Sequence, residues 1–134
     1  MLDDQAKREI LSNAKTIAVV GHSDKPARTS YQIAQYLRRA GYTVYAVNPS
    51  VEEIDGERSY ASLKDIPHHI DIVDVFRRAE HLPGIVEQAI EVEAGVVWAQ
   101  LGVANQEAAK RAHEAGMPII QDTCIKVEHA RLLG

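Results

Sequence analysis

The stretch Thr16–Tyr31, TIAVVGHSDKPARTSY, predicts a strand, a glycine turn and the start of a helix. Its first part, Ile17–Val20, is apolar, rich in β-branched residues and followed by Gly21, while Thr29 and Ser30 are residue types that favour a helix N-cap. A helix that starts after such a turn presents free backbone N–H groups and the positive end of its dipole to a phosphate. The stretch therefore predicts a phosphate-binding loop.

The glycine spacing of this loop differs from that of a dinucleotide site. Gly21-His22-Ser23 has no second or third glycine where the fingerprint G-x-G-x-x-G requires them. Dinucleotide sites also place an acid at the end of the second strand to accept from the ribose 2′-hydroxyl, and this chain has Asn48-Pro49 there. Both departures count against NAD. A simpler interpretation stays open, since a glycine serves any tight turn and Asn-Pro closes any strand.

Strand-like and helix-like segments alternate along the rest of the chain. Near-continuous apolar runs are typical of strands buried in a parallel sheet, and they predict strands at Thr16–Val20, Thr43–Val47, Ile70–Phe76, Gly95–Gln100 and Pro118–Gln121. Helical patterns occur at Asp3–Asn13, Tyr31–Arg39, part of Val51–Asp65, Leu82–Glu93 and Asn105–Ala115. Such alternation predicts right-handed βαβ crossovers. We expect one α/β domain over residues 1–134, a three-layer Rossmann-like fold with five parallel strands in the order 3-2-1-4-5 and helices on both faces.

Composition and charge narrow the classes of partner. A chain of 134 residues can bury a sizeable core without staples, and its single cysteine, Cys124, excludes an intramolecular disulfide. A net charge of −4 without a Lys/Arg stripe argues against a nucleic-acid partner. No apolar run approaches the ~20 residues of a membrane span, and the N-terminus does not resemble a signal peptide. We therefore expect a cytoplasmic protein that does not enter membranes.

The fold class also predicts where a ligand binds. Open α/β sheets bind ligands outside the carboxyl ends of the strands, where the strand order reverses, here between the strands expected at Thr16–Val20 and Gly95–Gln100. The residues at the expected strand ends are Gly21–Ser23, Asn48–Ser50, Phe76–Arg78, Gln100–Gly102 and Asp122–Cys124.

Several side chains at these ends are suited to a phosphorylated ligand. Ser23 offers a hydroxyl donor, Arg28 offers charge, Phe76 offers a flat face for an adenine ring, Arg77 offers a bidentate phosphate contact, and Gln100 can bond a pantetheine or ribose. Structural alternatives remain for most of these residues, namely a solvated arginine, a core aromatic ring or a turn.

The sequence nominates no catalytic group. Neither a Ser-His-Asp order, a paired carboxylate, a P-loop lysine nor a metal-ligand spacing among the six histidines is visible. Cys124 is either a small buried residue or a reactive thiol, and the sequence leaves both open. We therefore expect a binding domain without a bound metal.

The chain closely resembles the small stand-alone CoA-binding domain proteins, which in turn resemble the N-terminal CoA-binding domain of the succinyl-CoA synthetase α subunit. The resemblance covers Ile17–Leu133 and is carried, in order, by IAVVGHSDKPARTSYQIAQYL, GYTVYAVNP, DIVDVFRR, VVWAQLGVANQEAA and IKVEHARLL. It implies that coenzyme A or an acyl-CoA lies across the strand ends of a Rossmann-like fold. Because the ligase parts of the synthetase lie outside this domain, the resemblance implies binding and gives no support for ligase activity.

By position, the resemblance also implies the ligand contacts. The implied residues are Gly21, His22, Ser23 and Arg28 at the phosphates, Val47, Asn48, Pro49 and Ser50 at the adenosine, Phe76 and Arg77 beside the nucleotide, and Gln100, Leu101 and Gly102 along the pantetheine arm. The chain departs from many relatives at His22, where they have a small residue, and at Thr123, where they have arginine.

Three other functions stay open from the sequence. An NAD(P)-dependent redox enzyme or sensor is the main alternative, with Arg28 or Arg77 serving a 2′-phosphate. A thiol reaction would use Cys124, which could form a mixed disulfide with CoA or take an acyl group. A vestigial ligand site would leave a domain that acts through a homodimer or another protein partner.

Overall fold

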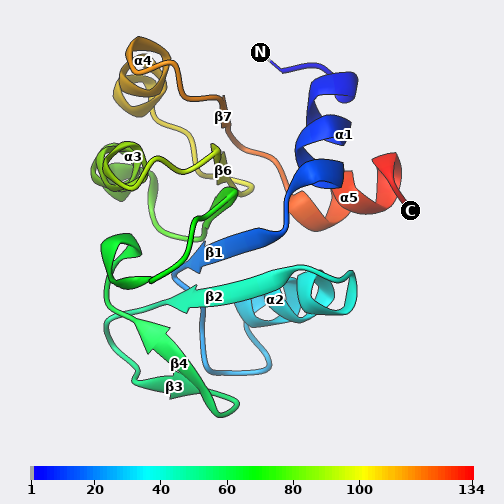
Figure 1. The fold of residues 1–134 in the computed structure, drawn as a ribbon, viewed down its shortest axis with the longest axis vertical. Coiled ribbons are helices and arrows are strands. Elements are labelled where there is room, and N and C mark those ends of the chain that lie inside the picture. The colour runs from blue at the N-terminus through cyan, green and yellow to red at the C-terminus, as the bar shows by residue number, and fades with distance from the viewer. Residues whose placement is uncertain (1) are drawn as a thin grey trace.

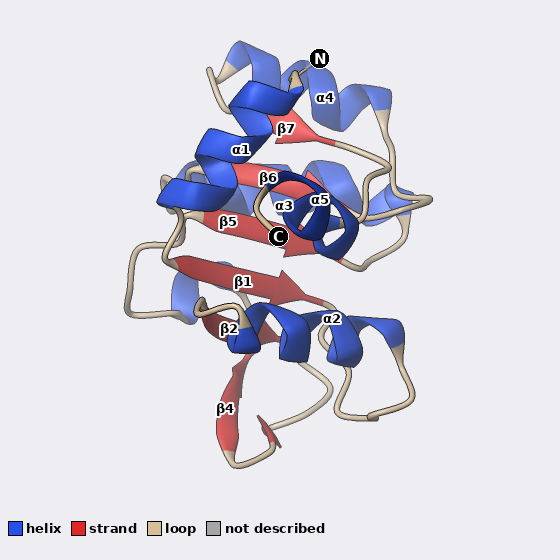
Figure 2. Ribbon diagram, turned by 90° about the vertical axis from the view of Figure 1, so that its right-hand side faces the viewer, coloured by secondary structure: helices blue, strands red, loops and turns tan. Residues whose placement is uncertain are grey.

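The computed structural model describes residues 2–134, and a seven-stranded sheet runs through its centre (Figure 1). The strands are β1 (Thr16–Val20), β2 (Thr43–Val47), β3 (Glu53–Ile54), β4 (Glu57–Tyr60), β5 (Ile72–Val75), β6 (Val96–Ala99) and β7 (Ile119–Ile120). The helices are α1 (Asp4–Asn13), α2 (Thr29–Arg39), α3 (Leu82–Glu91), α4 (Gln106–Glu114) and α5 (Ile125–Leu132), with short 3-10 turns η1 (Leu63–Asp65) and η2 (Ala79–His81). Figure 2 shows α1, α2 and α5 on the near face of the sheet and α3 and α4 on the far face.

The α/β Rossmann-like fold class is confirmed, but the expected strand number and order are wrong in detail. The sheet order is β3-β4-β2-β1-β5-β6-β7, and neighbouring strands pair in parallel except β3 with β4. The third expected strand, which forms β5, pairs with β1 and does not lie outside β2. The place outside β2 belongs to β4. The strand order therefore reverses between β1 and β5, and not between β1 and β6.

The unexpected strands come from Val51–Asp65, where part of the segment was expected to be helical. Asp55 and Gly56 have φ values of +52° and +82°, which fits the two-residue hairpin turn that Asp-Gly favours. The turn joins β3 to β4, and the only helical piece of the segment is the 3-10 turn η1. The Asp-Gly pair was therefore the decisive local signal.

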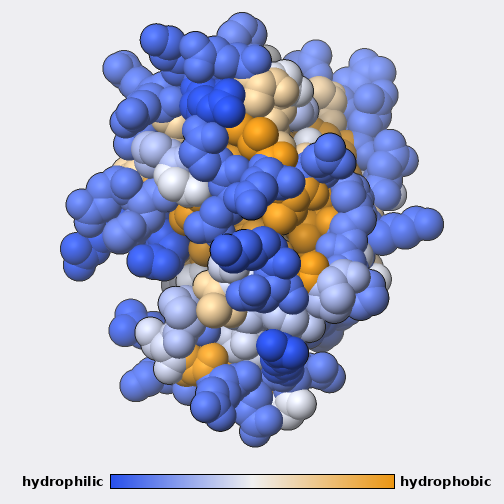
Figure 3. Space-filling view, turned by 60° about the vertical axis from the view of Figure 1, so that its left-hand side comes forward, coloured by the Kyte–Doolittle hydropathy of each residue, from blue (hydrophilic) through white to orange (hydrophobic). Residues whose placement is uncertain are grey.

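Alternate residues of the strands enter two separate cores. Ala18, Val20 and Val73 face one core with residues of α3 and α4, while Ile17 and Val19 face the other with residues of α1, α2 and α5. Burial on both faces explains why the strands are almost continuously apolar. On the side where α3 and α4 lie, Figure 3 shows hydrophilic side chains over most of the surface and apolar ones in its middle.

Side chains cap the N-termini of α1 and α4. Asp3 accepts from the backbone N–H of Ala6 at 2.8 Å to cap α1, and Asn105 accepts from the backbone N–H of Ala108 at 2.9 Å to cap α4.

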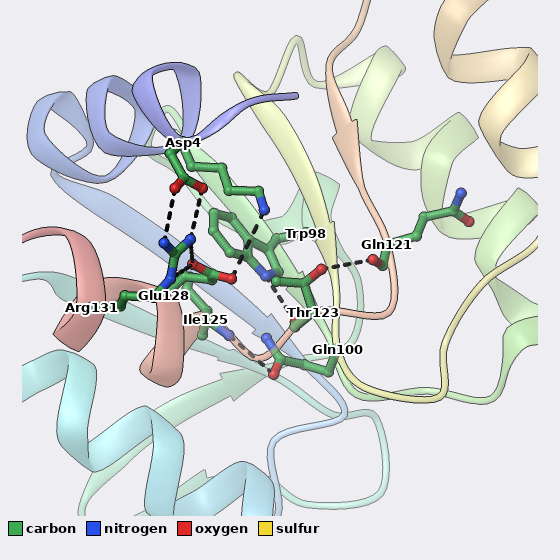
Figure 4. A network of polar contacts seen from close by, with 9 residues as sticks. Asp4, Trp98, Gln100, Gln121, Thr123, Ile125, Glu128 and Arg131 are labelled. Atoms are coloured by element: carbon green, nitrogen blue, oxygen red, sulfur yellow. Dashed lines mark hydrogen bonds and ion pairs between the residues drawn. The ribbon is translucent and has the colours of Figure 1, made fainter. Parts of the chain in front are cut away.

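The tail, for which no helix was expected, forms α5 and packs on α1. There Arg131 donates to both carboxylate oxygens of Asp4, at 2.7 and 2.9 Å (Figure 4). No helix within residues 2–134 is both long and apolar enough to cross a membrane.

Candidate functional site

A cleft of about 560 Å³ opens at the carboxyl end of the sheet, beside the point where the strand order reverses. It is lined by Gly21, Ser23, Ala27, Arg28, Thr29, Ser30, Asn48 and Phe76. The loop after β1 and the start of α2 form one side, and the ends of β2 and β5 supply Asn48 and Phe76. The structure thus brings together five of the predicted site residues, namely Gly21, Ser23, Arg28, Asn48 and Phe76.

Gly21 is required by the backbone geometry of this cleft. Its φ is +89°, and a Cβ atom there would lie 2.9 Å from the main-chain oxygen of Phe76 and 3.2 Å from Cδ of Arg77. Its N–H donates to the main-chain oxygen of Val47 at 2.8 Å. A single glycine therefore permits the loop after β1 to touch the end of β5, and Arg77 lies against it.

Asn48 joins the ends of β1 and β2 through its side chain. Its Nδ2 donates to the main-chain oxygen of His22 at 2.9 Å, and its Oδ1 accepts from the N–H of Ser50 at 2.9 Å. Its backbone is also paired, because its N–H donates to Tyr60 at 2.9 Å and its oxygen accepts from the Ser59 hydroxyl at 3.0 Å. Asn48 therefore fixes the loop that follows β1.

The start of α2 is open to an anion. No side chain caps the helix at Arg28. The first hydrogen bond of the helix runs from the N–H of Gln32 to the main-chain oxygen of Arg28. The N–H groups of the helical residues before Gln32 therefore lack partners within the helix. Thr29 and Ser30, expected as caps, are instead the first two helical residues, and the Ser30 hydroxyl accepts from the N–H of Ser23 at 3.0 Å.

The hydroxyl of Ser23 is also available to a ligand. Its oxygen accepts from the N–H of Lys25 at 3.0 Å, so the hydroxyl proton remains free to donate. The exposed guanidinium of Arg28 adds positive charge at the same edge. Together with the dipole of α2, these groups have the chemistry that suits a phosphate.

His22 lies under the loop and does not line the cleft. Its side chain is fully buried, Nδ1 lies 2.8 Å from the main-chain oxygen of Ser23, and the ring packs edge-on against Tyr31. Burial lowers the pKa of His22, and the hydrogen bond to Ser23 opposes that effect only in part. Any contact of His22 with a ligand would come from its main chain.

The other predicted residues fall into two groups. Pro49, Ser50, Leu101 and Gly102 are exposed, whereas Val47 and Gln100 are buried. The exposed turn at Leu101 and Gly102 is held by the N–H of Gly102, which donates to Oδ1 of Asp122 at 2.7 Å. At this turn the protein surface presents backbone and the exposed Leu101 side chain.

Gln100 connects the end of β6 to α5 from inside the protein. Its Nε2 donates to Oδ1 of Asp74. Its Oε1 accepts from the N–H of Ile125 at 3.4 Å, a contact drawn in Figure 4. Asp74 is fully buried, and this burial raises its pKa to about 8. Asp74 is not among the residues predicted from the sequence, although it is the one acid within the apolar run of β5.

Cys124 does not complete a recognisable reactive site. It is half-buried, packs beside the core shared with α1, α2 and α5, and precedes α5. The adjacent Thr123 accepts from Nε1 of the buried Trp98 at 3.0 Å through its main-chain oxygen. Within residues 2–134, no group of three His, Cys, Asp or Glu side chains is placed to hold a metal ion.

Comparisons with known proteins agree with this architecture. The family model of the CoA binding domain matches residues 15–130. The uncharacterized protein YneT of Bacillus subtilis is 49% identical over 123 residues, which cover 92% of this chain and 91% of that protein. The solved structure of a hypothetical protein from Pyrococcus horikoshii is similar, with a TM-score of 0.96 and 47% identity over 99% of this chain and 94% of that one.

The chain is also similar to part of a larger enzyme. The α subunit of ADP-forming acetate–CoA ligase II from Pyrococcus furiosus is 29% identical over 138 aligned residues, covering 90% of this chain but 29% of the subunit. The chain thus spans less than a third of that relative. With the family match over nearly its whole length, the chain belongs to the CoA binding domain family.

Proposed function

We propose that this chain binds coenzyme A or an acyl-CoA in the cleft between the loop after β1 and the ends of β2 and β5. The observation that carries the proposal is the uncapped start of α2, which stands beside Ser23 and Arg28 in a member of the CoA binding domain family. Coenzyme A carries a pyrophosphate and a ribose phosphate, so its recognition depends on such groups. The free N–H groups, the hydroxyl and the guanidinium supply donors and positive charge without a metal.

The nucleotide side of the cleft favours a phosphorylated ribose over the ribose of NAD. Position 48 carries no acid to accept from a 2′-hydroxyl, and both polar groups of the Asn48 side chain are already bonded to His22 and Ser50. A ribose phosphate therefore meets no carboxylate at this position. Phe76, half-buried at the end of β5, lies in the same cleft and offers a face for the adenine ring.

The pantetheine arm would then run along the strand ends toward β6 and α5. The exposed turn at Leu101 and Gly102 lies on that side, two strands away from β1 in the sheet order. The Pyrococcus furiosus relative named as an acetate–CoA ligase subunit is a protein of which this chain covers less than a third. We propose binding alone for this chain.

The proposal is tested by calorimetric titration of the purified chain with CoA, acetyl-CoA, NAD and NADP. The Arg28→Ala variant should weaken CoA binding by about tenfold, the effect of about 1.4 kcal/mol from a charged contact near a helix N-terminus. Arg39→Ala is the matched control, since Arg39 is an exposed arginine in the last turn of the same helix. Tighter binding of NAD than of CoA, or equal effects of the two variants, would overturn the proposal.

A further inference from the structure

Asp74 is an acid in the middle of the sheet that the cleft itself does not use. It has no exposed surface, and its register neighbours are Val19 of β1 and Trp98 of β6. Its Oδ1 accepts from the amide of Gln100, while Oδ2 has no hydrogen-bond partner. A buried carboxyl group with one donor for two oxygens is costly, so its presence calls for a reason.

The contacts of Gln100 supply that reason. The N–H of Ile125, the first residue of α5, can only donate, so the Gln100 oxygen must face α5 and its nitrogen must face the interior. The nitrogen then requires a buried acceptor, which Asp74 provides. Without Asp74, the amide of Gln100 would lose the partner that fixes its orientation.

We propose that Asp74 is a positioning residue for the ligand site, because it fixes Gln100 and thereby the turn Leu101–Gly102 against the start of α5. Gln100 directly precedes this turn, and Gly102 is bonded to Asp122 in the loop that leads to α5. A change in the Gln100 amide therefore reaches both sides of the predicted pantetheine path. This inference rests on the proposed function, since that function places the pantetheine arm at the turn.

The arrangement fits Asp74 in its uncharged form. Burial raises the pKa of Asp74 to about 8, and the hydrogen bond from Gln100 offsets this only in part. The side chains set against it by β1 and β6, namely Val19, Trp98 and Gln100, are uncharged. Ionisation would strengthen the hydrogen bond from Gln100 but leave Oδ2 charged without a donor, which would draw water or another donor into the core and disturb the packing around Gln100.

His22 is another buried titratable side chain, which follows the end of β1, and it does not set the pKa of Asp74. Its pKa is set by burial, by Ser23, and by the charges of Arg38 and Asp55, with no contribution from Asp74. A pH effect that originates at Asp74 can therefore be separated from one that originates at His22, which titrates on the acidic side of neutrality.

The first experiment follows the amide signals of the Gln100 side chain and of the Ile125 backbone by NMR, without ligand, from about pH 6.5 to about pH 9.5. Both signals should shift with one midpoint near pH 8 in the wild type, and neither should do so in Asp74→Asn, which keeps an oxygen acceptor but cannot ionise. Asp71→Asn is the control, because Asp71 lies just before the same strand and bonds the N–H groups of Lys15 and Thr16. It should retain the wild-type titration.

The second experiment measures the affinity for acetyl-CoA, whose thiol is blocked, over the same pH range. Wild type and Asp71→Asn should bind about tenfold more weakly at the alkaline end, whereas Asp74→Asn should vary by less than about twofold. The inference would be overturned if the two amide signals did not titrate in the wild type, or if they did titrate in Asp74→Asn. It would also be overturned if the signals titrated without a change in affinity. If neither CoA nor acetyl-CoA binds at any pH, the proposed function fails, and the amide signals alone then decide whether Asp74 controls Gln100.

Discussion

Asn48 donates a 2.9 Å hydrogen bond to the main-chain oxygen of His22, so the end of β2 fixes the loop that follows β1. In a dinucleotide site the acid at this position bonds the ribose. Here the amide bonds the protein, and a carboxylate could not replace it, since a carboxylate has no N–H to donate. The difference between amide and acid at one position therefore bears on both the loop conformation and the choice of nucleotide.

Asn48→Asp should weaken CoA binding by about tenfold and lower the free energy of unfolding by about 1–2 kcal/mol, because a carboxylate would face the main-chain oxygen of His22. Titration calorimetry and urea unfolding measure the two effects. Asn13→Asp, an exposed change of the same charge at the end of α1, should affect neither. Unchanged CoA affinity and unchanged unfolding free energy in Asn48→Asp would show that the hydrogen bond from Asn48 to His22 does not fix the loop after β1.

Gly21→Ala should be clearly more destabilising than Gly41→Ala, another glycine with a positive φ. An alanine there must adopt a φ of +89° and place its Cβ 2.9 Å from the main-chain oxygen of Phe76. Gly41→Ala is the matched control, since Gly41 has a φ of +107° but no atom within 4 Å of a Cβ. We expect Gly41→Ala to cost about 1 kcal/mol from backbone strain and Gly21→Ala at least about 2 kcal/mol. Equal losses of unfolding free energy in the two variants, measured by urea unfolding, would mean that the backbone around Phe76 shifts without cost to accommodate the Cβ atom.

The strand-helix alternation could be predicted because strands buried on both faces leave continuous apolar runs. The order of the strands could not, because it depends on which segment occupies the place beside β2. The segment Glu57–Tyr60 that fills this place is polar and short, with Ser59 its buried member. Periodicity carries little information over so few residues, and the Asp-Gly hairpin signal at Asp55 and Gly56 was the better guide.

The cleft residues were predictable to the extent that strand ends meet at one edge of a sheet. Gly21, Ser23, Asn48 and Phe76 follow from this rule and lie together in the cleft, whereas Arg28 was predicted from the loop before α2. Whether a side chain there points outward or inward depends on tertiary packing, which sequence patterns do not encode. His22 and Gln100 are therefore at the predicted edge but are buried beneath it.

His22 should make the fold sensitive to acid. Burial lowers its pKa below the model-peptide value of 6.5, so the folded state resists the proton that the unfolded state takes up. The stability contributed by neutral His22 is present above about pH 6.5 and is lost as the pH falls toward the lowered folded-state pKa.

His22→Leu removes this sensitivity. Lowering the pH from about 7 to about 5 should reduce the unfolding free energy of the wild type more than that of His22→Leu. His113→Leu, which replaces an exposed histidine on α4, controls for the loss of a histidine as such. A difference between wild type and His22→Leu that does not change with pH would show that His22 titrates alike in the folded and unfolded chain.

Asp74 should have the opposite pH signature in stability. Its pKa rises from 3.8 in the unfolded chain to about 8 in the fold, so the folded state holds a proton that the unfolded state releases. The contribution of the neutral acid is complete below about pH 4 and is lost progressively up to about pH 8. Relative to Asp74→Asn, the wild type should lose about 1.4 kcal/mol of unfolding free energy per pH unit within this window.

Urea unfolding of both proteins at about pH 5, 6 and 7 measures this slope, and the contributions of ionisable groups common to both proteins cancel in the difference. A zero slope would show that the carboxyl group of Asp74 is already ionised in the fold at neutral pH, and that its buried contact with Gln100 is a bond to a carboxylate.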